Sequence, residues 1–395
     1  MTFPYNTSMR LFSGPLARRV LSTAAATVLL FSTAACGNNI PLNMEPEAEL
    51  LSVIGTDTRH LTGQFAGAGS SAQKAAVEAW IAGYNTYQPD VDIAYDPSGS
   101  GAGVNSFLQG ATLWAGSDKA LTQDQKDLSR EVCMDEEAID LPVYISPLAV
   151  IYNLPGLNDE HLTMSADVIA DIFDGTITTW NDERIADLNP ALADRLPDTR
   201  ITPVWRSDKS GTTNSFQQFL SQAAPENWKS APQETWPNAI GQGAKGTSGV
   251  VTALSQAVGT IGYADAAQSS DLGTVAVAQL DDAGQSVGVA PDSGKAANLA
   301  AEAIQRLDEG EDMTLDIDYS TRDEQVYPIV QISYSIVCPS YSDDTENWFV
   351  GSWLTFQASK QGQQLAASTA GSAPLPSEVS EHITKIGSTM MGATS

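Results

Sequence analysis

Three short segments rich in Gly, Ser and Thr precede apolar residues that recur at helical spacing. They are Gly67–Ser71, Ser98–Gly103 and Ser210–Thr213. The apolar residues follow at i, i+3 and i+4, which predicts that each turn opens an amphipathic helix. The start of a helix exposes free N–H groups, and Gly lets an anion approach the backbone closely. One such turn can simply cap its helix, but three together indicate an anion-binding site.

The third turn follows a pair of charged residues. Arg206 and Asp208 lie just before Ser210 in the chain. An Arg side chain offers a fork of donors that suits a tetrahedral oxyanion, and a neighbouring carboxylate can hold that fork in place. We therefore expect Arg206 to bind the anion and Asp208 to orient the side chain of Arg206.

The composition limits the classes of partner. The 395 residues include 20 Lys+Arg and 48 Asp+Glu, which gives a formal net charge of −28. Such an acid excess argues against binding to nucleic acid or to an anionic membrane surface. The apolar content of 42% supports a packed core, and the length favours two domains. Hydroxyl and amide donors at helix starts can bind an anion without a basic patch.

Enzyme and metal motifs are missing from the sequence. It contains no Gly-x-Ser-x-Gly elbow, and Gly241–Thr247 lacks the adjacent Gly-Lys-Ser/Thr of a nucleotide-binding loop. His60, His161 and His382 are isolated from one another. We therefore predict no catalytic residue, no metal site and no cofactor.

The first residues have the pattern of an export signal. Met1–Arg19 contains three Arg and no acidic residue, and Val20–Phe31 is an apolar run. A basic start, an apolar run and a small-residue end predict a signal peptide. The run is shorter than the ~20 apolar residues that span a bilayer.

Cys36 directly follows the small residues Thr33–Ala35, which resembles a bacterial lipobox. Thr33 departs from that pattern, which prefers Leu there. We predict a lipoprotein signal peptide over residues 1–35, acylation of Cys36, and a polar tether over residues 36–60. The alternative is a plain signal peptide with an incidental Cys.

Cys133 and Cys338 are then an even pair in an exported protein. The oxidising compartment favours a disulfide between them. Two buried free thiols are the alternative interpretation.

Several blocks of residues resemble, in their order along the chain, the phosphate-binding lipoproteins of Pst-type ABC phosphate importers, which form the PstS family. The resemblance runs from about Leu61 to Val379, and the Cys pair and inserts resemble the actinobacterial branch. The blocks are Leu61–Thr62 with Gly67–Ser71, Ser98–Val104, Ala115–Asp118, Tyr152–Gly156, Ile172–Ile177, Thr179–Asp182, Arg206–Thr212 and Ile261–Tyr263.

The resemblance implies a set of phosphate-binding residues. The family's ligands fall on Ser70, Ser71 and the backbone of Ala72 in the first turn, on Ser100, on Asp118, and on Arg206, Ser210, Gly211 and Thr212. It also gives Asp208 the role of orienting Arg206. Two departures affect the first turn, because Gly63–Ala66 forms an apparent insertion and Ala72 stands where many members have Phe.

The resemblance further implies an α/β fold, the two-lobed periplasmic-binding-protein (class II) architecture. Two crossing hinge strands are expected near Leu141–Ile145 and Val326–Ile329. Lobe one would comprise residues 61–145 plus 327–386, and lobe two residues 146–326. Closure about the hinge would bury the anion between ligands from both lobes.

The implied function is capture of inorganic phosphate at the extracytoplasmic face of the cell membrane, where a lipid anchor holds the protein. Delivery would be to the membrane subunits of an ABC permease with a cytoplasmic ATPase. A secreted phosphatase is one alternative, although no His lies in any ligand block. A tethered phosphate sensor or adhesin on the same fold is another alternative.

Overall fold

The computed structural model describes residues 54, 59–269, 271–304 and 312–392. The predicted signal peptide, Cys36 and most of the predicted tether lie outside these residues. Within the described ranges, no helix combines the length and the apolarity needed to cross a membrane.

The first sheet has the strand order β2-β1-β3-β11-β4. Its strands are β1 (Gly63–Gly69), β2 (Val91–Asp96), β3 (Trp114–Ser117), β11 (Val330–Val337) and the first part of β4 (Ile139–Asn153). β1 is parallel to β2 and β3, whereas β11 is antiparallel to β3 and β4. Parallel strands need crossover connections, and α2 and α3 supply them here.

The second sheet continues from the second part of β4 in the order β4-β8-β6-β7, with β9 also paired to β4. Its other strands are β5 (His161–Met164), β6 (Thr202–Arg206), β7 (Gln242–Ala244), β8 (Thr260–Asp265), β9 (Gly273–Leu280) and β10 (Ser286–Val289). β6 is parallel to β7 and β8, so β6 and β7 both end at the same edge, where Arg206 and Ala244 lie.

Strand β4 joins the two sheets. Residues Ile139 to Pro147 pair with β11, and Leu148 to Asn153 pair with β8. The whole strand is buried, which fits its nearly continuous apolar sequence. The expected crossing strand Leu141–Ile145 therefore lies inside β4, and the change of partner comes just after it. The lobe boundaries themselves stay a prediction.

The pairing of β4 with β11 contains a register shift at Ser333 and Tyr334. Ser333 pairs with Tyr144 and Tyr334 pairs with Pro142, which leaves Val143 as an extra residue on β4. Such a bulge suits Pro142, which has no N–H for the ladder, and it changes the direction of nearby side chains.

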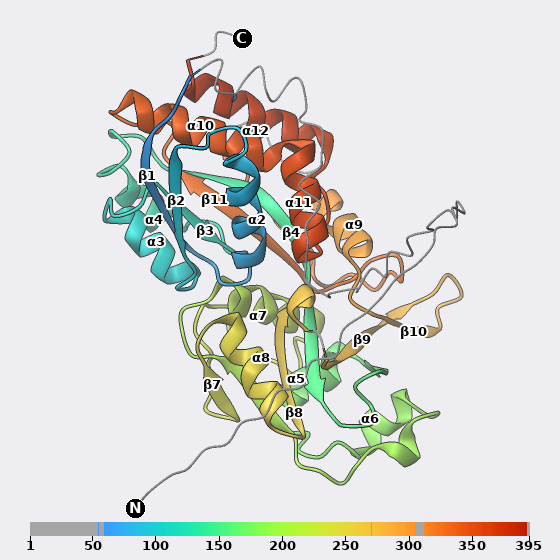
Figure 1. Ribbon diagram of the computed structural model, residues 1–395. Helices are drawn as coiled ribbons and strands as arrows, with labels where there is room; N and C mark the ends of the chain where they lie inside the picture. Colours follow the sequence, from blue (N-terminus) through green and yellow to red (C-terminus); the bar gives the residue numbers. More distant parts are fainter. Residues whose placement is uncertain (1–53, 55–58, 270, 305–311, 393–395) are drawn as a thin grey trace, which may run out of the picture. The chain divides into compact units, whose positions relative to one another are not determined.

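Helices cover both sheets (Figure 1). They are α2 (Lys74–Tyr84), α3 (Ser100–Leu108), α4 (Gln123–Ser129), α5 (Ala166–Phe173), α6 (Glu183–Leu188), α7 (Gly211–Ala223), α8 (Gly246–Gln256), α9 (Ser293–Ile304), α10 (Asp344–Ala358), α11 (Lys360–Ala370) and α12 (Ser377–Met390). α10 is buried continuously from Trp348, and it packs against α12, α11 and α2. Asp343 caps it by accepting the N–H groups of Thr345 and Glu346.

Aromatic rings fill the core of the first sheet. Tyr84 on α2 makes edge-to-face contacts with Phe349, Trp353 and Phe356 on α10. Trp114 on β3 lies against the same group. These large side chains fix α2 and α10 against the strands whose ends carry the first two turns.

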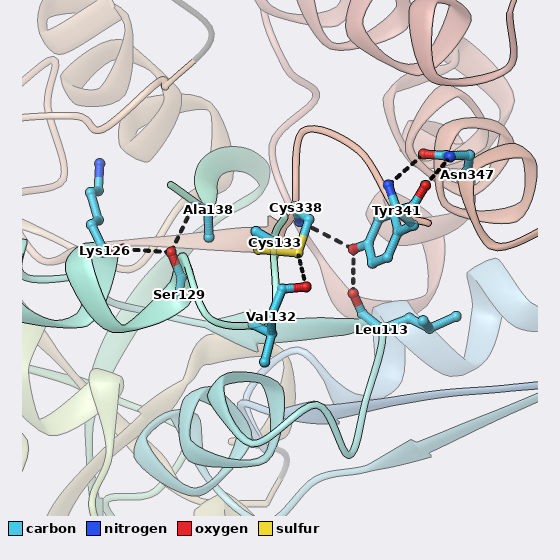
Figure 2. Close-up of a disulfide and its surroundings, with 9 residues drawn as sticks. All are labelled: Leu113, Lys126, Ser129, Val132, Cys133, Ala138, Cys338, Tyr341 and Asn347. Carbon is cyan, nitrogen blue, oxygen red and sulfur yellow. Dashed lines mark hydrogen bonds between the residues drawn. A yellow bond between two sulfur atoms is a disulfide. The ribbon is translucent and has the colours of Figure 1, made fainter. Parts of the chain in front are cut away.

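The predicted disulfide is confirmed. Cys133 and Cys338 are bonded, with an S–S distance of 2.05 Å (Figure 2). Cys338 follows β11 directly, and its N–H donates to the hydroxyl of Tyr341, which in turn donates to the carbonyl of Leu113. The bridge therefore fastens the loop before β4 to the end of β11.

Candidate anion-binding site

The three predicted turns lie at the ends of strands, and helices follow them as the spacing predicts. α7 begins at Gly211, and Ser210 caps it by accepting the N–H of Thr213 at 3.2 Å. α3 begins at Ser100. α2 begins only at Lys74, so the first turn forms a longer loop between β1 and its helix.

Asp118, directly after β3, is surrounded by hydroxyl donors and is only 4% exposed. Its Oδ2 accepts from Ser70 Oγ at 2.7 Å, Thr212 Oγ1 at 2.9 Å and Ser100 Oγ at 3.4 Å. Its Oδ1 accepts from Ser333 Oγ at 2.7 Å. The structure thus brings residues of all three predicted turns to one carboxylate, including Thr212 at the start of α7, the helix that follows β6 of the second sheet. This burial excludes a surface turn cap as the role of Asp118.

Arg206, at the end of β6, forms a two-point ion pair with Asp208. Its Nε and Nη2 donate to the two carboxylate oxygens at 2.8 and 2.6 Å, and its side chain is 2% exposed. Burial opposes ionisation of Asp208, but the hydrogen bonds and charge of Arg206 outweigh it and hold the pKa of Asp208 below its usual value. The N–H of Gly246 also donates to Asp208 Oδ1 at 3.0 Å. Asp208 therefore fixes the plane of the guanidinium.

Ser71 faces Thr247, a residue outside the three predicted turns. The two hydroxyl oxygens are 3.1 Å apart, and the N–H of Thr247 donates to Ser71 Oγ at 3.0 Å. Arg206 Nη1 donates to Thr247 Oγ1 at 3.4 Å. Ser71, from the first sheet, is thereby connected to Arg206, from the second.

Two glycines allow this close approach. A Cβ on Gly211 would lie 2.8 Å from both Asp118 Cβ and Ser100 Oγ. Gly99 has φ +106°, and a Cβ there would lie 2.5 Å from Asp208 Oδ2. Any larger residue at either position would push apart groups that come from different sheets.

The backbone N–H groups of two predicted ligands, Ala72 and Ser210, donate to other groups of the protein. The N–H of Ala72 donates to Ser70 Oγ at 3.1 Å. Ser210 is fully buried, and its N–H donates to the carbonyl of Glu234 at 2.9 Å. In this structure both residues shape their turns.

Thr247 and Ser333 are the site residues that sequence reasoning missed, and each carried a signal. Gly246 and Thr247 open α8, whose apolar residues Val250 and Leu254 follow at helical spacing, so this is a fourth Gly/Thr turn. Ser333 lies between Gln331 and Ser335 on β11, an alternation of buried polar side chains in an otherwise apolar strand.

The arrangement can bind an oxyanion that also carries an O–H group. Hydroxyls, backbone N–H groups and one guanidinium supply donors, and Asp118 supplies an acceptor. Among the described residues, no group of His, Cys, Asp and Glu is placed to hold a metal ion.

Comparison with known proteins gives consistent matches. A family model described as a PBP superfamily domain matches residues 56–361. The phosphate-binding protein PstS 2 of Mycobacterium tuberculosis is 34% identical over 316 residues, which are 78% of this chain and 82% of that protein. The phosphate-binding protein PstS of Methanocaldococcus jannaschii is 31% identical over 277 residues, 68% of this chain and 70% of that protein.

The fold has counterparts among solved structures. A phosphate-binding protein from Stenotrophomonas maltophilia matches with a TM-score of 0.63 and 18% identity, over 82% of this chain and 94% of that one. This confirms the predicted α/β fold, the two-lobed fold of periplasmic binding proteins. The sequence relatives show that the chain belongs to the PstS family of phosphate-binding proteins.

Proposed function

We propose that the protein captures inorganic phosphate outside the cytoplasmic membrane and delivers it to an ABC permease. The observation that carries the proposal is the buried pairing of Asp118 with hydroxyls of Ser70, Ser100 and Thr212. Thr212 lies shortly after the Arg206–Asp208 ion pair in the chain. Phosphate needs many donors and, because it carries at least one O–H near pH 7, at least one acceptor. Sequence relatives named phosphate-binding protein PstS support the same ligand.

The proposed ligands are those that the family resemblance names. In this proposal Arg206 neutralises charge on the anion, and hydroxyls and N–H groups of the three turns bind its oxygens. Asp118 accepts the phosphate O–H, and Asp208 orients Arg206 without contacting the ligand. The two lobes, residues 61–145 with 327–386 and residues 146–326, close about the hinge and bury the anion.

The remaining parts of the proposal concern the membrane. Acylated Cys36 anchors the protein at the extracytoplasmic face, and the tether over residues 36–60 lets it reach the permease. A Cys36→Ala variant should leave the membrane fraction and appear in the soluble one. Retention of that variant in the membrane would contradict acylation of Cys36 as the anchor. It would not bear on the proposal that the protein binds phosphate.

Calorimetric titration of the purified protein tests the ligand. Phosphate should bind at one site, and sulfate should give no heat at the same concentrations. A phosphate monoester should remain intact in a parallel turnover assay, because binding and release make no covalent change. Release of phosphate from the monoester would favour the secreted phosphatase, and absence of phosphate binding would overturn the proposal.

A cellular assay separates a transporter component from a sensor or adhesin. Deletion of the gene should lower uptake of labelled phosphate from dilute medium, and the wild-type gene should restore it. Unchanged uptake, with phosphate binding intact, would favour the sensor or adhesin.

A further inference from the structure

Thr247 forms hydrogen bonds with both Ser71 and Arg206. It is 1% exposed and is the second residue of α8, which packs on β6 and β8. Ser71 belongs to the loop after β1 of the first sheet. Its side chain therefore reaches a helix of the other sheet.

The hydrogens of this pair can be counted. Each hydroxyl carries one hydrogen and two lone pairs. Ser71 Oγ accepts the N–H of Thr247 at 3.0 Å, and the two hydroxyl oxygens share a hydrogen bond at 3.1 Å. One of the two hydroxyl hydrogens lies in that shared bond, so the other remains to be donated elsewhere.

The shared bond can form in either direction, and its direction decides which hydroxyl keeps the free hydrogen. When Thr247 donates to Ser71, both lone pairs of Ser71 Oγ are used, one by the N–H and one by the O–H of Thr247. Ser71 can then act only as a donor to a third group. The oxygen of Thr247 remains an acceptor for Arg206 Nη1, which lies 3.4 Å away. The hydroxyl of Thr247 thus contacts two proposed phosphate ligands, Ser71 and Arg206.

We propose that Thr247 is a positioning residue for phosphate: it holds Ser71 as a donor to the anion and joins it to Arg206 across the two sheets. The inference rests on the proposed function and deepens it, because it assigns a fourth helix start to the same site. Thr247 acts through Ser71 and Arg206. Its neighbour Gly246 supports the same arrangement by donating to Asp208.

The primary test is Thr247→Val, which keeps the shape and the backbone N–H and removes the hydroxyl. Phosphate affinity should fall by about 5- to 150-fold, the range for removal of one partner of a buried polar group. The loss should appear mainly in koff, because a contact that joins the two sides acts after the anion has entered. Thr247→Ser, which retains the hydroxyl, should restore wild-type affinity.

The matched control is Thr252→Val, the same change on the exposed side of α8. It should leave phosphate affinity within about 2-fold of wild type, as surface substitutions usually do. The melting temperature of each variant without phosphate shows whether a loss of affinity reflects general destabilisation.

A double-mutant cycle shows whether Thr247 acts through Ser71. In a Ser71→Ala background, Thr247→Val should cost less than about 3-fold, because the hydroxyl that it positions is already gone. An equal loss in both backgrounds would overturn the inference. So would a Thr247→Val variant with wild-type affinity.

The outcomes also separate this inference from the function on which it rests. Wild-type protein that binds no phosphate overturns both. Wild-type binding together with an unaffected Thr247→Val overturns the positioning role alone. If Thr247→Val fails to fold, Ser71→Ala tests the same bond from the first sheet, and an unchanged phosphate affinity and koff in that variant overturns the inference.

Discussion

The two sides of the site use different chemistry. The side on the first sheet places hydroxyls around a buried carboxylate, with Ser70 and Ser333 each 2.7 Å from Asp118. The side on the second sheet places a guanidinium beside the starts of α7 and α8, with Asp208 holding Arg206. This division suggests that the second side supplies attraction for an anion and that the first side decides which anion is accepted.

The largest expected effect concerns Asp118. An ionised carboxylate can only accept hydrogen bonds, so it can bond the O–H of phosphate but faces a bare oxygen on sulfate. Sites built for one hydroxyl reject analogues lacking it by about 10⁴–10⁵-fold. Wild-type protein should therefore bind phosphate and ignore sulfate. Asp118→Asn should lower the ratio of phosphate affinity to sulfate affinity, because the amide supplies a hydrogen-bond donor and the substitution removes a negative charge.

The measurement is calorimetry of both anions with both proteins. Asp92→Asn, an exposed position on β2, is the control and should keep the wild-type ratio. A variant at Asp118 that discriminates as sharply as wild type would contradict the division between the two sides, and selectivity would have to come from elsewhere.

The next largest effect concerns Arg206. Removing one partner of a buried hydrogen-bonded charge pair typically costs ~2–5 kcal/mol. Arg206→Ala should therefore weaken phosphate binding by about 30-fold to several thousand-fold. The variant should still prefer phosphate to sulfate. Calorimetry measures the loss, and circular dichroism checks that the fold survives.

Arg195→Ala provides a control for the loss of one positive charge. Arg195 is an exposed residue that pairs with Glu160, and its removal should change phosphate affinity little. Equal effects of the two substitutions would indicate that overall charge, and not the second side of the site, attracts the anion.

The sequence predicted those parts of the site that are local. Each turn and the helix after it depend on residues within a short segment, so Ser100 and Thr212 could be selected from the pattern alone. The disulfide followed from a count of two cysteines in an exported chain. Arg206 was selected because it lies directly before the third turn and offers a fork of donors. Asp118 came from the resemblance alone, because a single carboxylate carries no pattern of its own.

The missed residues depend on long-range structure. Ser333 meets Asp118 only because β11 returns from far along the chain to lie between β3 and β4, where Val143 shifts the register. No local pattern determines that pairing. Thr247 does lie in a local Gly/Thr pattern at the start of α8, but the same segment resembles an incomplete nucleotide-binding loop. Its contact with Ser71 depends on how the two sheets meet.

The smallest expected effect concerns Asp265, a second carboxylate held by hydroxyls. It ends β8, and its Oδ2 accepts from Tyr144 at 2.8 Å and Ser146 at 2.7 Å, both on β4. Unlike Asp118, Asp265 joins two neighbouring strands, β4 and β8, that already pair with each other. Burial raises the pKa of Asp265 to about 6, because these hydrogen bonds offset only part of the cost of charging it.

The sign of the pH effect follows from that shift. An unfolded Asp ionises near pH 4, so between about pH 4 and pH 6 the folded protein binds the proton that the unfolded chain has lost. The contribution of Asp265 to stability is present below pH 4 and decreases as the pH rises to 6, by at most about 3 kcal/mol. Asp140, whose pKa burial and Asp312 raise to about 7, adds the same trend in wild type.

Asp265→Asn isolates one contribution, because the variant keeps Asp140. Urea unfolding at pH 4, 5, 6 and 7 should show the variant gaining stability relative to wild type as the pH rises, with the difference levelling off above pH 6. The amide oxygen can still accept from Tyr144 and Ser146, so the two proteins should be most alike near pH 4, where Asp265 is protonated in the folded state. A difference that stays constant with pH would mean that Asp265 is charged at little cost. Burial would then not raise the pKa of Asp265, and any fall in stability of the wild-type protein with rising pH would have to come from Asp140.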